Sequence, residues 1–470
     1  MTDQPAGRAT GASAGAPTGL PSGTTPGTAD PDTRLRRAVT GPLLYLFILG
    51  DVLGAGVYAL VGEVAGQVGG AIWVPLLAAL VLALLTAGSY AELVTKYPRA
   101  GGSAVFAERA FRSPLVAFLV GFCMLAAGVT SAAGLALAFA GDYLGVFLDV
   151  PPTAAAVVFL LLVALLNARG IRESLRANLV MTLVETSGLV LVVVLGAVVL
   201  GRGDGDPGRA LEFPPGVSAA TAVLSAALLA YYSFVGFETS ANVAEEVRDV
   251  RRVYPRALFG SLLTAGVVYV LVGLAAAVVL PPSELAGSSG PLLEVVRAAD
   301  AGVPDWLFSA VALIAVANGA LLTMIMASRM AYGLAEQRLL PAVLGRVLPQ
   351  RRTPWVAIAV TTLVAMGLTL VGDLATLANT VVLLLLFVFL STNTAVLVLR
   401  RDRVAADHFR VPAVVPVLAI ASCLLLLWQQ TAVTWGLAGL LLAVGVVLYL
   451  VTAVPRRRAE ARQRDDVRVG

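Results

Sequence analysis

The stretch that decides the fold is residues 50–58, which read GDVLGAGVY. It stands inside the first long apolar segment, from Leu43 to about Gly66, and about 20 apolar residues are enough to cross a bilayer. A plain lipid-facing helix would carry Leu and Val at its centre, whereas this one carries an acid and three glycines. Each glycine in a helix interior costs roughly 0.8–1.0 kcal/mol relative to alanine. Backbone groups freed at membrane depth are tolerated only when they are buried in protein or line a cavity. The stretch therefore predicts a spanning helix that is interrupted in its middle for a functional reason.

The break has two interpretations. In the first, Ala55, Gly56 and Val57 offer bare amide N–H groups to an anion at the start of a half-helix, where the helix dipole also favours negative charge. In the second, the small residues Gly54 and Ala55 only allow another helix to pack closely. The stretch alone does not decide between them.

The composition is that of an integral membrane protein. Of the 470 residues, 58% are hydrophobic and 13% are charged, whereas soluble domains have about 25% charged residues. The two cysteines, Cys123 and Cys423, lie in apolar segments, and the single histidine, His408, lies in a polar loop. We therefore expect no metal site, no disulfide framework, no cofactor and no Ser-His catalytic pair, so an enzyme is disfavoured. The charge of +4 does not indicate a nucleic-acid partner, because its placement along the chain explains it better.

Apolar segments of spanning length recur twelve times, at roughly 43–68, 72–95, 115–146, 153–169, 177–200, 217–244, 255–280, 304–334, 354–371, 374–398, 411–429 and 432–453. All but three of the 33 Lys and Arg residues fall on one side of this alternation; the exceptions are Arg202, Arg209 and Arg297. Basic residues mark the cytoplasmic side. The sequence thus predicts twelve spans in the cytoplasmic membrane with both termini cytoplasmic, and a disordered tail over residues 1–33.

A second interruption occurs in segment 217–244, where residues 230–242 read AYYSFVGFETSAN. Interruptions at corresponding positions of two halves indicate a midplane binding site in a transporter. Five segments per repeat would force the second copy to insert upside down. The prediction is a first repeat over residues 34–200, an inverted repeat over 201–400, two further helices over 401–453 and a basic cytoplasmic tail over 454–470.

Acids inside the spans are costly, at roughly 2.5–3.5 kcal/mol each at a helix centre. Snorkelling or an internal hydrogen bond is the simpler explanation for Glu63 and Glu92, which lie nearer to the ends of their segments. This explanation fits Asp51, Glu185 and Glu238 poorly, because each of these acids lies in the interior of its apolar segment. We expect a functional role for these three acids.

Five motifs occur together between residues 43 and 345. They are GDVLGAGVY (50–58), YPRAGGS (97–103), SFVGFE (233–238), AEEV (244–247) with PR at 255–256, and ASRMAYGLA (327–335) with LP at 340–341. With these motifs the chain resembles the amino acid–polyamine–organocation permeases, and among them the bacterial relatives of cationic amino acid transporters. The resemblance implies the leucine-transporter type of 5+5 inverted-repeat fold, with broken first and sixth helices, and an amino acid substrate.

The resemblance also implies a site. By position, the amides of Ala55, Gly56 and Val57 would hold the substrate carboxylate. The substrate ammonium group would meet freed carbonyls, which the match assigns to Tyr232, Ser233, Phe234 and Val235. These motifs recognise the backbone of an amino acid and say little about its side chain, although the acids lean weakly toward a cationic one.

The chain departs from the family pattern at a position that would couple transport to an ion gradient. Some proton-coupled relatives look to carry a lysine in the fifth helix, and the match places Glu185 at or near it. An acid cannot imitate a fixed cation, but it can bind a proton, whereas residues 317–322 around Asn318 lack the adjacent hydroxyls of a sodium site. The hypothesis is proton coupling or gating through Glu185, Glu238 or Asp51, or no coupling at all.

The predicted function is a secondary amino acid permease that works by alternating access. No GxxxxGK[ST] nucleotide-binding loop occurs, so gradients rather than ATP would drive it. An amino acid exchanger and a non-transporting amino acid sensor are the alternatives. A channel is disfavoured, because two dissimilar breaks in one chain suit a single asymmetric site. The amino acid, the coupling and the oligomeric state stay open.

Overall fold

The structure is a computed structural model that describes residues 39–54, 56–98, 101–169, 175–348, 351, 353–404 and 407–469, with the side chains of 175–179 and 453–469 left out. The chain divides into two units, Met1–Arg36 and Arg37–Gly470, and the described residues belong to the second. The tail predicted over residues 1–33 therefore lies outside the described residues.

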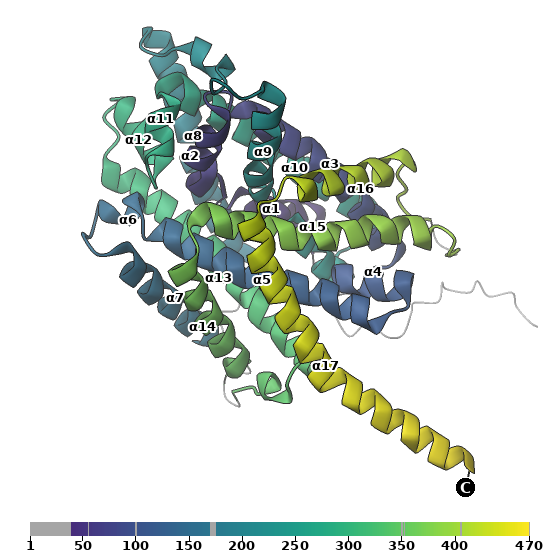
Figure 1. Ribbon diagram of the computed structural model, residues 1–470. Helices are drawn as coiled ribbons and strands as arrows, with labels where there is room; N and C mark the ends of the chain where they lie inside the picture. Colours follow the sequence, from purple (N-terminus) through teal and green to yellow (C-terminus); the bar gives the residue numbers. More distant parts are fainter. Residues whose placement is uncertain are drawn as a thin grey trace, which may run out of the picture. The chain divides into compact units, whose positions relative to one another are not determined.

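Within the described ranges, nine helical stretches are long and apolar enough to cross a membrane. They are built from α3 (Trp73–Lys96), α5 (Pro114–Phe139) with α6 (Asp142–Gly145), α7 (Pro152–Arg169), α8 (Leu175–Arg202), α9 (Ala219–Tyr232) with the 3-10 helix η2 (Phe237–Glu246), α10 (Val250–Val279), α13 (Asp305–Glu336), α15 (Leu374–Leu399) and α17 (Ala432–Val469). A bent pair, α1 (Gly41–Leu53) and α2 (Gly56–Val68), gives up to ten. The protein is therefore a helical multi-pass membrane protein (Figure 1).

The two remaining predicted spans coincide with shorter apolar helices, α14 (Trp355–Val371) and α16 (Val414–Trp428). With 17 and 15 residues they are shorter than the typical length of a spanning helix. Each predicted segment thus corresponds to helix, while the count of twelve spans stays a prediction. Short helices occupy the connections: α4 (Gly102–Phe111), η1 (Pro207–Leu211), α11 (Pro282–Ala286), α12 (Pro291–Ala298) and η3 (Ala342–Gly345).

Several long helices begin where the sequence supplies a cap. Ser113 accepts a hydrogen bond from the Val116 amide before Pro114 opens α5. Asp373 does the same for the Thr376 amide at the start of α15, at 2.7 Å. Caps of this kind satisfy amides that have no partner within the helix. They fix where each span starts, and hence which residues reach its middle.

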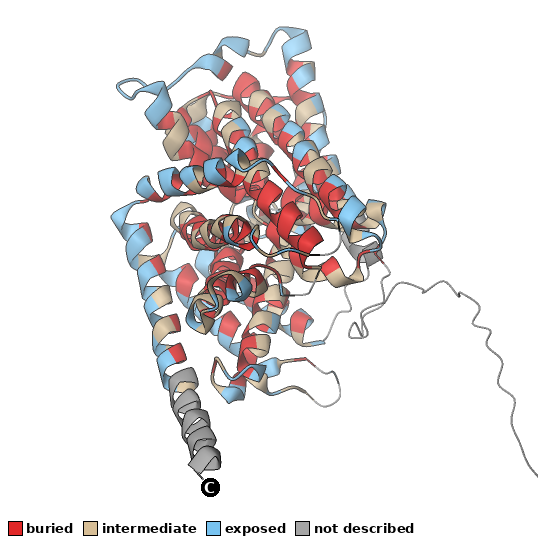
Figure 2. Ribbon diagram, turned by 90° about the vertical axis from the view of Figure 1, so that its right-hand side faces the viewer, coloured by how far each residue is buried: buried red, intermediate tan, exposed pale blue. Residues whose placement is uncertain are grey.

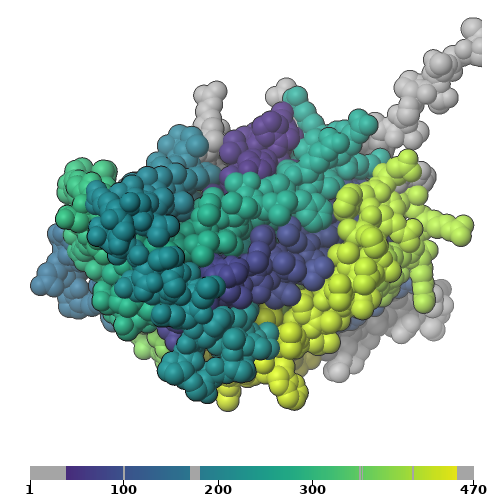
Figure 3. All heavy atoms as spheres, turned by 90° about the horizontal axis from the view of Figure 1, so that it is seen from above, coloured from purple at the N-terminus to yellow at the C-terminus, as the bar shows by residue number. Residues whose placement is uncertain are grey.

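The helices pack around a core in which α13 and α15 contact α5, while α1 and α3 contact α10. Figure 2 shows the buried residues concentrated where these helices meet, and exposed residues along the described part of α17. In Figure 3, α3 lies between α10 and α16, both of which it contacts. Large apolar side chains on outer helices remain exposed, such as Trp428 and Leu370, as expected for surfaces that face lipid rather than water.

A buried ion pair joins the ends of α3 and α15. Arg400 donates from Nε to Glu92 Oε1 at 3.0 Å and from Nη2 to Glu92 Oε2 at 2.7 Å. The Val411 amide donates to the same carboxylate at 3.0 Å. Glu92 therefore has the internal partners that the simpler explanation predicted, and its role is structural.

Candidate functional site

The first predicted break is present. α1 ends at Leu53, α2 begins at Gly56, and the two helices are bent by 41° relative to each other. Gly54, with φ −47° and ψ −165°, leaves the helical conformation after α1. Ala55 lies outside the described residues. The N–H groups of the first turn of α2, which starts at Gly56, have no intrahelical partners, and a helix end of this kind can bind an anion.

The second predicted break is present as well. α9 ends at Tyr232, and the chain continues as the 3-10 helix η2 only from Phe237. Gly236 has φ +125°, a backbone conformation that side-chain-bearing residues rarely adopt. The glycine in this motif is therefore required by the backbone.

The two breaks touch each other. A β-carbon at position 56 would lie 2.8 Å from the Ser233 Cα, and one at position 236 would lie 2.7 Å from the backbone oxygen of Asp51. Glycine is needed at both positions because backbone stands where a side chain would begin. Nearer the start of α1, Val39 pairs with η2, since the Val39 amide donates to the Glu246 carbonyl at 2.9 Å.

A cavity of about 370 Å³ lies beside this contact. Its walls come from the two broken spans and from α5, α13 and α15. Apolar side chains dominate the α5, α13 and α15 walls, including Met124, Leu135, Leu322, Met326 and Leu385. Such a cavity, mostly apolar with a few polar groups, is typical of small-molecule sites.

Most of the predicted site residues meet at this cavity. Its lining includes Gly56, Tyr232, Ser233, Val235, Asp51 and Glu238. Val57 and Phe234 are buried away from it, as is Glu185. Val57 and Phe234 therefore do not line the cavity, and Glu185, for which proton coupling or gating rather than substrate contact is predicted, lies outside its lining as well.

Hydrogen bonds tie the breaks to their surroundings. The Tyr269 hydroxyl, from α10, donates to the Val52 carbonyl at 2.5 Å and to the Ser233 carbonyl at 3.1 Å. The Tyr232 hydroxyl pairs with Ser131 of α5 at 2.8 Å. Sequence reasoning missed Tyr269 because it stands in an otherwise apolar segment with no motif around it.

Both acids of the cavity wall accept hydrogen bonds from residues of the second broken span. Thr239 donates to Asp51 Oδ2, and the Gly236 amide donates to Glu238 Oε2 at 2.9 Å. Asp51 on α1 thus contacts η2 through a side chain as well as through Gly236. Thr239 and Asn242 line the same cavity, and their spacing of three residues could have marked one helical face.

Glu185 has a different environment. It is fully buried, its Oε1 accepts from Asn318 Nδ2 of α13 at 2.9 Å, and its Oε2 has no hydrogen-bond partner. The Tyr58 hydroxyl of α2 donates to its backbone carbonyl at 2.7 Å. A buried carboxylate oxygen without a donor is costly in the ionised form.

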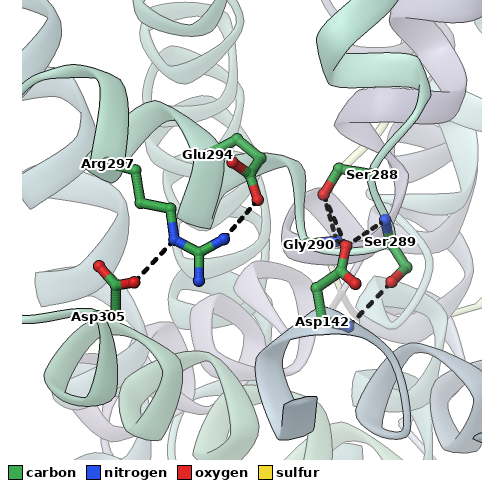
Figure 4. Close-up of polar contacts among 7 residues, drawn as sticks. All are labelled: Asp142, Ser288, Ser289, Gly290, Glu294, Arg297 and Asp305. Carbon is green, nitrogen blue, oxygen red and sulfur yellow. Dashed lines mark hydrogen bonds and ion pairs between the residues drawn. The ribbon is translucent and has the colours of Figure 1, made fainter. Parts of the chain in front are cut away.

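Hydrogen bonds join the α2 half of the first broken span, and the loop beside it, to neighbouring segments. The Tyr143 hydroxyl donates to the Tyr58 carbonyl at 2.9 Å. Beside Tyr143, Asp142 Oδ2 accepts from the Ser288 hydroxyl and the Ser289 amide, both at 2.8 Å, and from the Gly290 amide at 3.1 Å (Figure 4). We call Asp142 with residues 288–290 the Asp142 latch.

Two further contacts lie in the connection between α10 and α13. A β-carbon at Gly62 of α2 would lie 2.4 Å from the Leu285 carbonyl oxygen of α11. In Figure 4, Arg297 of α12 lies between Glu294 and Asp305 and pairs with each at 2.8 Å. The connection between α10 and α13 is therefore packed onto α2.

The cavity extends toward the opposite end, where its lining includes the exposed Arg329. Arg329 lies inside α13, seven residues before Glu336. Its long side chain lets the guanidinium group reach water from within the helix. Within the described ranges, no group of three or more His, Cys, Asp or Glu residues is placed to hold a metal ion.

Two broken spans beside one cavity are the arrangement in which many transporters form their substrate site. The sequence pattern of the family described as "Amino acid permease" matches residues 43–454. The chain belongs to this amino acid permease family and is a transporter, not an enzyme.

Three relatives illustrate the range of the family. An uncharacterized transporter of Mycobacterium tuberculosis is 32% identical over 426 residues, which cover 89% of this chain and 91% of the relative. The branched-chain amino acid permease BcaP of Bacillus subtilis is 26% identical over 443 residues, covering 89% and 93%. The vacuolar cationic amino acid transporter 2 of Arabidopsis thaliana is 30% identical over 390 residues, covering 78% and 60%. The resemblance to amino acid permeases, including cationic amino acid transporters, is confirmed.

Proposed function

We propose that the protein is a secondary active transporter that moves amino acids across the cytoplasmic membrane by alternating access, with proton coupling. The observation that carries the proposal is the direct contact of two broken spans at the wall of a cavity. Close packing alone does not explain why both spans lose their helical backbone at one point beside a cavity.

The substrate backbone fits the polarity of the two breaks. The first turn of α2, from Gly56, supplies amide donors for a carboxylate, and Ala55 completes this end in the proposal. The carbonyl of Ser233 supplies an acceptor for an ammonium group at the end of α9. Gly56 and Ser233 are in contact, and the two charged groups of an α-amino acid are about as close. This match supports an α-amino acid over a substrate with one charged end.

The cavity walls favour an apolar substrate side chain. Asp51 and Glu238 already accept hydrogen bonds from Thr239 and from the Gly236 amide. The facing walls of α5 and α13 present Met124, Leu322 and Met326 among others. A cationic side chain would lose hydration against these apolar walls, because its acceptors lie mainly on the side of the two breaks. We therefore favour neutral amino acids such as leucine over the cationic ones toward which the acids alone lean.

Alternating access needs a gate on each side of the site. The cavity reaches from the breaks toward Arg329, on the side predicted to be cytoplasmic, while the Asp142 latch and α11 cover the other side. The present conformation is then the one open to the cytoplasm. In this proposal the repeats 34–200 and 201–400 are inverted copies, and the twelve spans leave both termini cytoplasmic.

Proton coupling is assigned to Glu185. Its unpartnered Oε2 and its contact with Asn318 join α8 to α13, while Tyr58 joins α8 to the α2 half of the first broken span. Protonation removes the cost of the buried charge, so it would favour one arrangement of these elements over another. Glu238 is the weaker candidate because the Gly236 amide already donates to it.

The test is uptake by purified protein in liposomes, over a panel of labelled amino acids, with and without an inward proton gradient. We expect uptake of neutral amino acids that the gradient stimulates, and loss of that stimulation in Glu185→Gln, whose amide matches the protonated acid in shape. Glu238→Gln is the matched comparison. A Glu185→Gln protein that keeps the full response to the gradient clears Glu185 of this role. Uptake that requires amino acid inside the liposomes identifies an exchanger, and binding without uptake identifies a sensor.

A further inference from the structure

Tyr269 reaches both broken spans from behind the cavity wall. Its hydroxyl is 2.5 Å from the Val52 carbonyl oxygen, in the last turn of α1, and 3.1 Å from the Ser233 carbonyl oxygen, just after α9. Val52 and Ser233 both line the cavity. Tyr269 itself is fully buried, so it acts on the site through these two peptide groups.

The hydroxyl has one proton for two acceptors. The hydroxyl oxygen lies nearer to the Val52 carbonyl oxygen than to the Ser233 carbonyl oxygen. A carbonyl oxygen has two lone pairs, so Ser233 retains the capacity to accept from a second donor. An ammonium group is a charged donor, whose hydrogen bonds are about twice as strong as neutral ones.

The ring of Tyr269 is held in place. Phe234, also fully buried, packs edge-on against it with ring centroids 5.2 Å apart and planes at 72°. Ser233 also contacts Gly56, where a β-carbon would lie 2.8 Å from the Ser233 Cα. The peptide group of Ser233 is therefore fixed between the start of α2 and the Tyr269 hydroxyl.

We propose that Tyr269 is the positioning residue of the amino acid site, and that its hydroxyl holds the Ser233 carbonyl in the orientation that accepts from the substrate ammonium group. This inference rests on the proposed function. It explains why Phe234, predicted to contact the substrate, is buried behind the wall instead: it orients the tyrosine that orients the carbonyl.

The experiment compares two competitors that differ in the ammonium group. L-leucine and 4-methylpentanoate share the carboxylate and the side chain, and each competes with labelled leucine for full-length protein in nanodiscs. The variants are Tyr269→Phe and the matched control Tyr254→Phe, from the same helix, whose hydroxyl pairs with Ser240 at 2.8 Å instead of with a peptide group of the breaks.

We expect the wild type to prefer leucine. In Tyr269→Phe the preference falls about tenfold, through loss of one charge-assisted bond, while the affinity for 4-methylpentanoate changes less than about twofold. Tyr254→Phe keeps the wild-type preference. A structural role alone would lower both affinities together, so an unchanged ratio in Tyr269→Phe overturns the inference.

Phe234→Leu provides a second test that retains the hydroxyl, and it decides the matter if Tyr269→Phe does not fold. Loosening the ring lowers the leucine preference in the same direction, and an unchanged preference in a folded Phe234→Leu protein counts against the inference. A wild type that does not distinguish leucine from 4-methylpentanoate contradicts the proposed ammonium site itself. A wild type that does, beside a Tyr269→Phe protein that still does, contradicts only the role of Tyr269.

Discussion

Replacing Gly56 by alanine is the sharpest perturbation of the contact between the two breaks. The added β-carbon would lie 2.8 Å from the Ser233 Cα, whereas ordinary contact begins at 3.4 Å. The difference, 3.4 − 2.8, requires the two backbones to separate by about 0.6 Å. No side chain can yield instead, because the obstructing atom belongs to the main chain.

Overpacking of this kind costs about 1–3 kcal/mol. If the breaks separate in the folded protein, the cost appears in substrate binding, where it corresponds to an affinity about 5- to 150-fold lower. Equilibrium binding of labelled leucine to Gly56→Ala protein measures it, with the melting temperature recorded alongside. Gly333→Ala in α13 is the control, because a β-carbon there has nothing within 4 Å.

The expected result is weak binding by Gly56→Ala and wild-type binding by Gly333→Ala. If Gly56→Ala binds leucine as the wild type does and melts at the same temperature, the close contact of the two breaks is refuted. A lower melting temperature with unchanged affinity would show that the contact is structural and that the substrate lies elsewhere.

Three further predictions concern the packing outside the cavity. Arg400→Met leaves the buried Glu92 carboxylate without its ion pair and should destabilise the fold by about 3–5 kcal/mol, seen as a lower melting temperature than in the exposed control Arg401→Met. Asp142→Ala removes the acceptor of three hydrogen bonds; a cysteine placed at Ser233 should then react faster with an impermeant thiol reagent from the outside, and an unchanged rate would contradict the latch. The Tyr97 hydroxyl, which donates to Asp402, holds the pKa of that carboxyl below its usual value. The bond therefore stabilises the fold fully at a pH above the ordinary pKa of an aspartate, and this stabilisation is lost as the pH falls through the lowered pKa of Asp402. The difference in melting temperature between wild type and Tyr97→Phe should vanish in acid.

The two breaks could be predicted because they violate the local pattern of their segments. Glycines and acids in the middle of a spanning run are explained by a broken helix, and the structure ends α1 at Leu53 and α9 at Tyr232. The need for glycine at position 236 becomes visible only in the structure, because few other residues adopt φ +125°.

The partners of the site residues could not be predicted in the same way. Tyr269 is 36 residues from Ser233, and Asn318 is 133 residues from Glu185, so their contacts depend on how distant helices pack. The direction in which each side chain points could not be predicted from the sequence either. Phe234 stands between two cavity-lining residues in sequence but packs against Tyr269, because the chain leaves α-helical periodicity there and no period fixes its direction.

An experimental structure of the protein determined with leucine would show whether an amino acid binds across the two breaks. We expect density in the cavity beside the contact of Gly56 and Ser233, with the carboxylate at the first turn of α2 and the ammonium group on the Ser233 carbonyl. Density elsewhere, or a continuous helix through residues 232–237, would contradict this expectation.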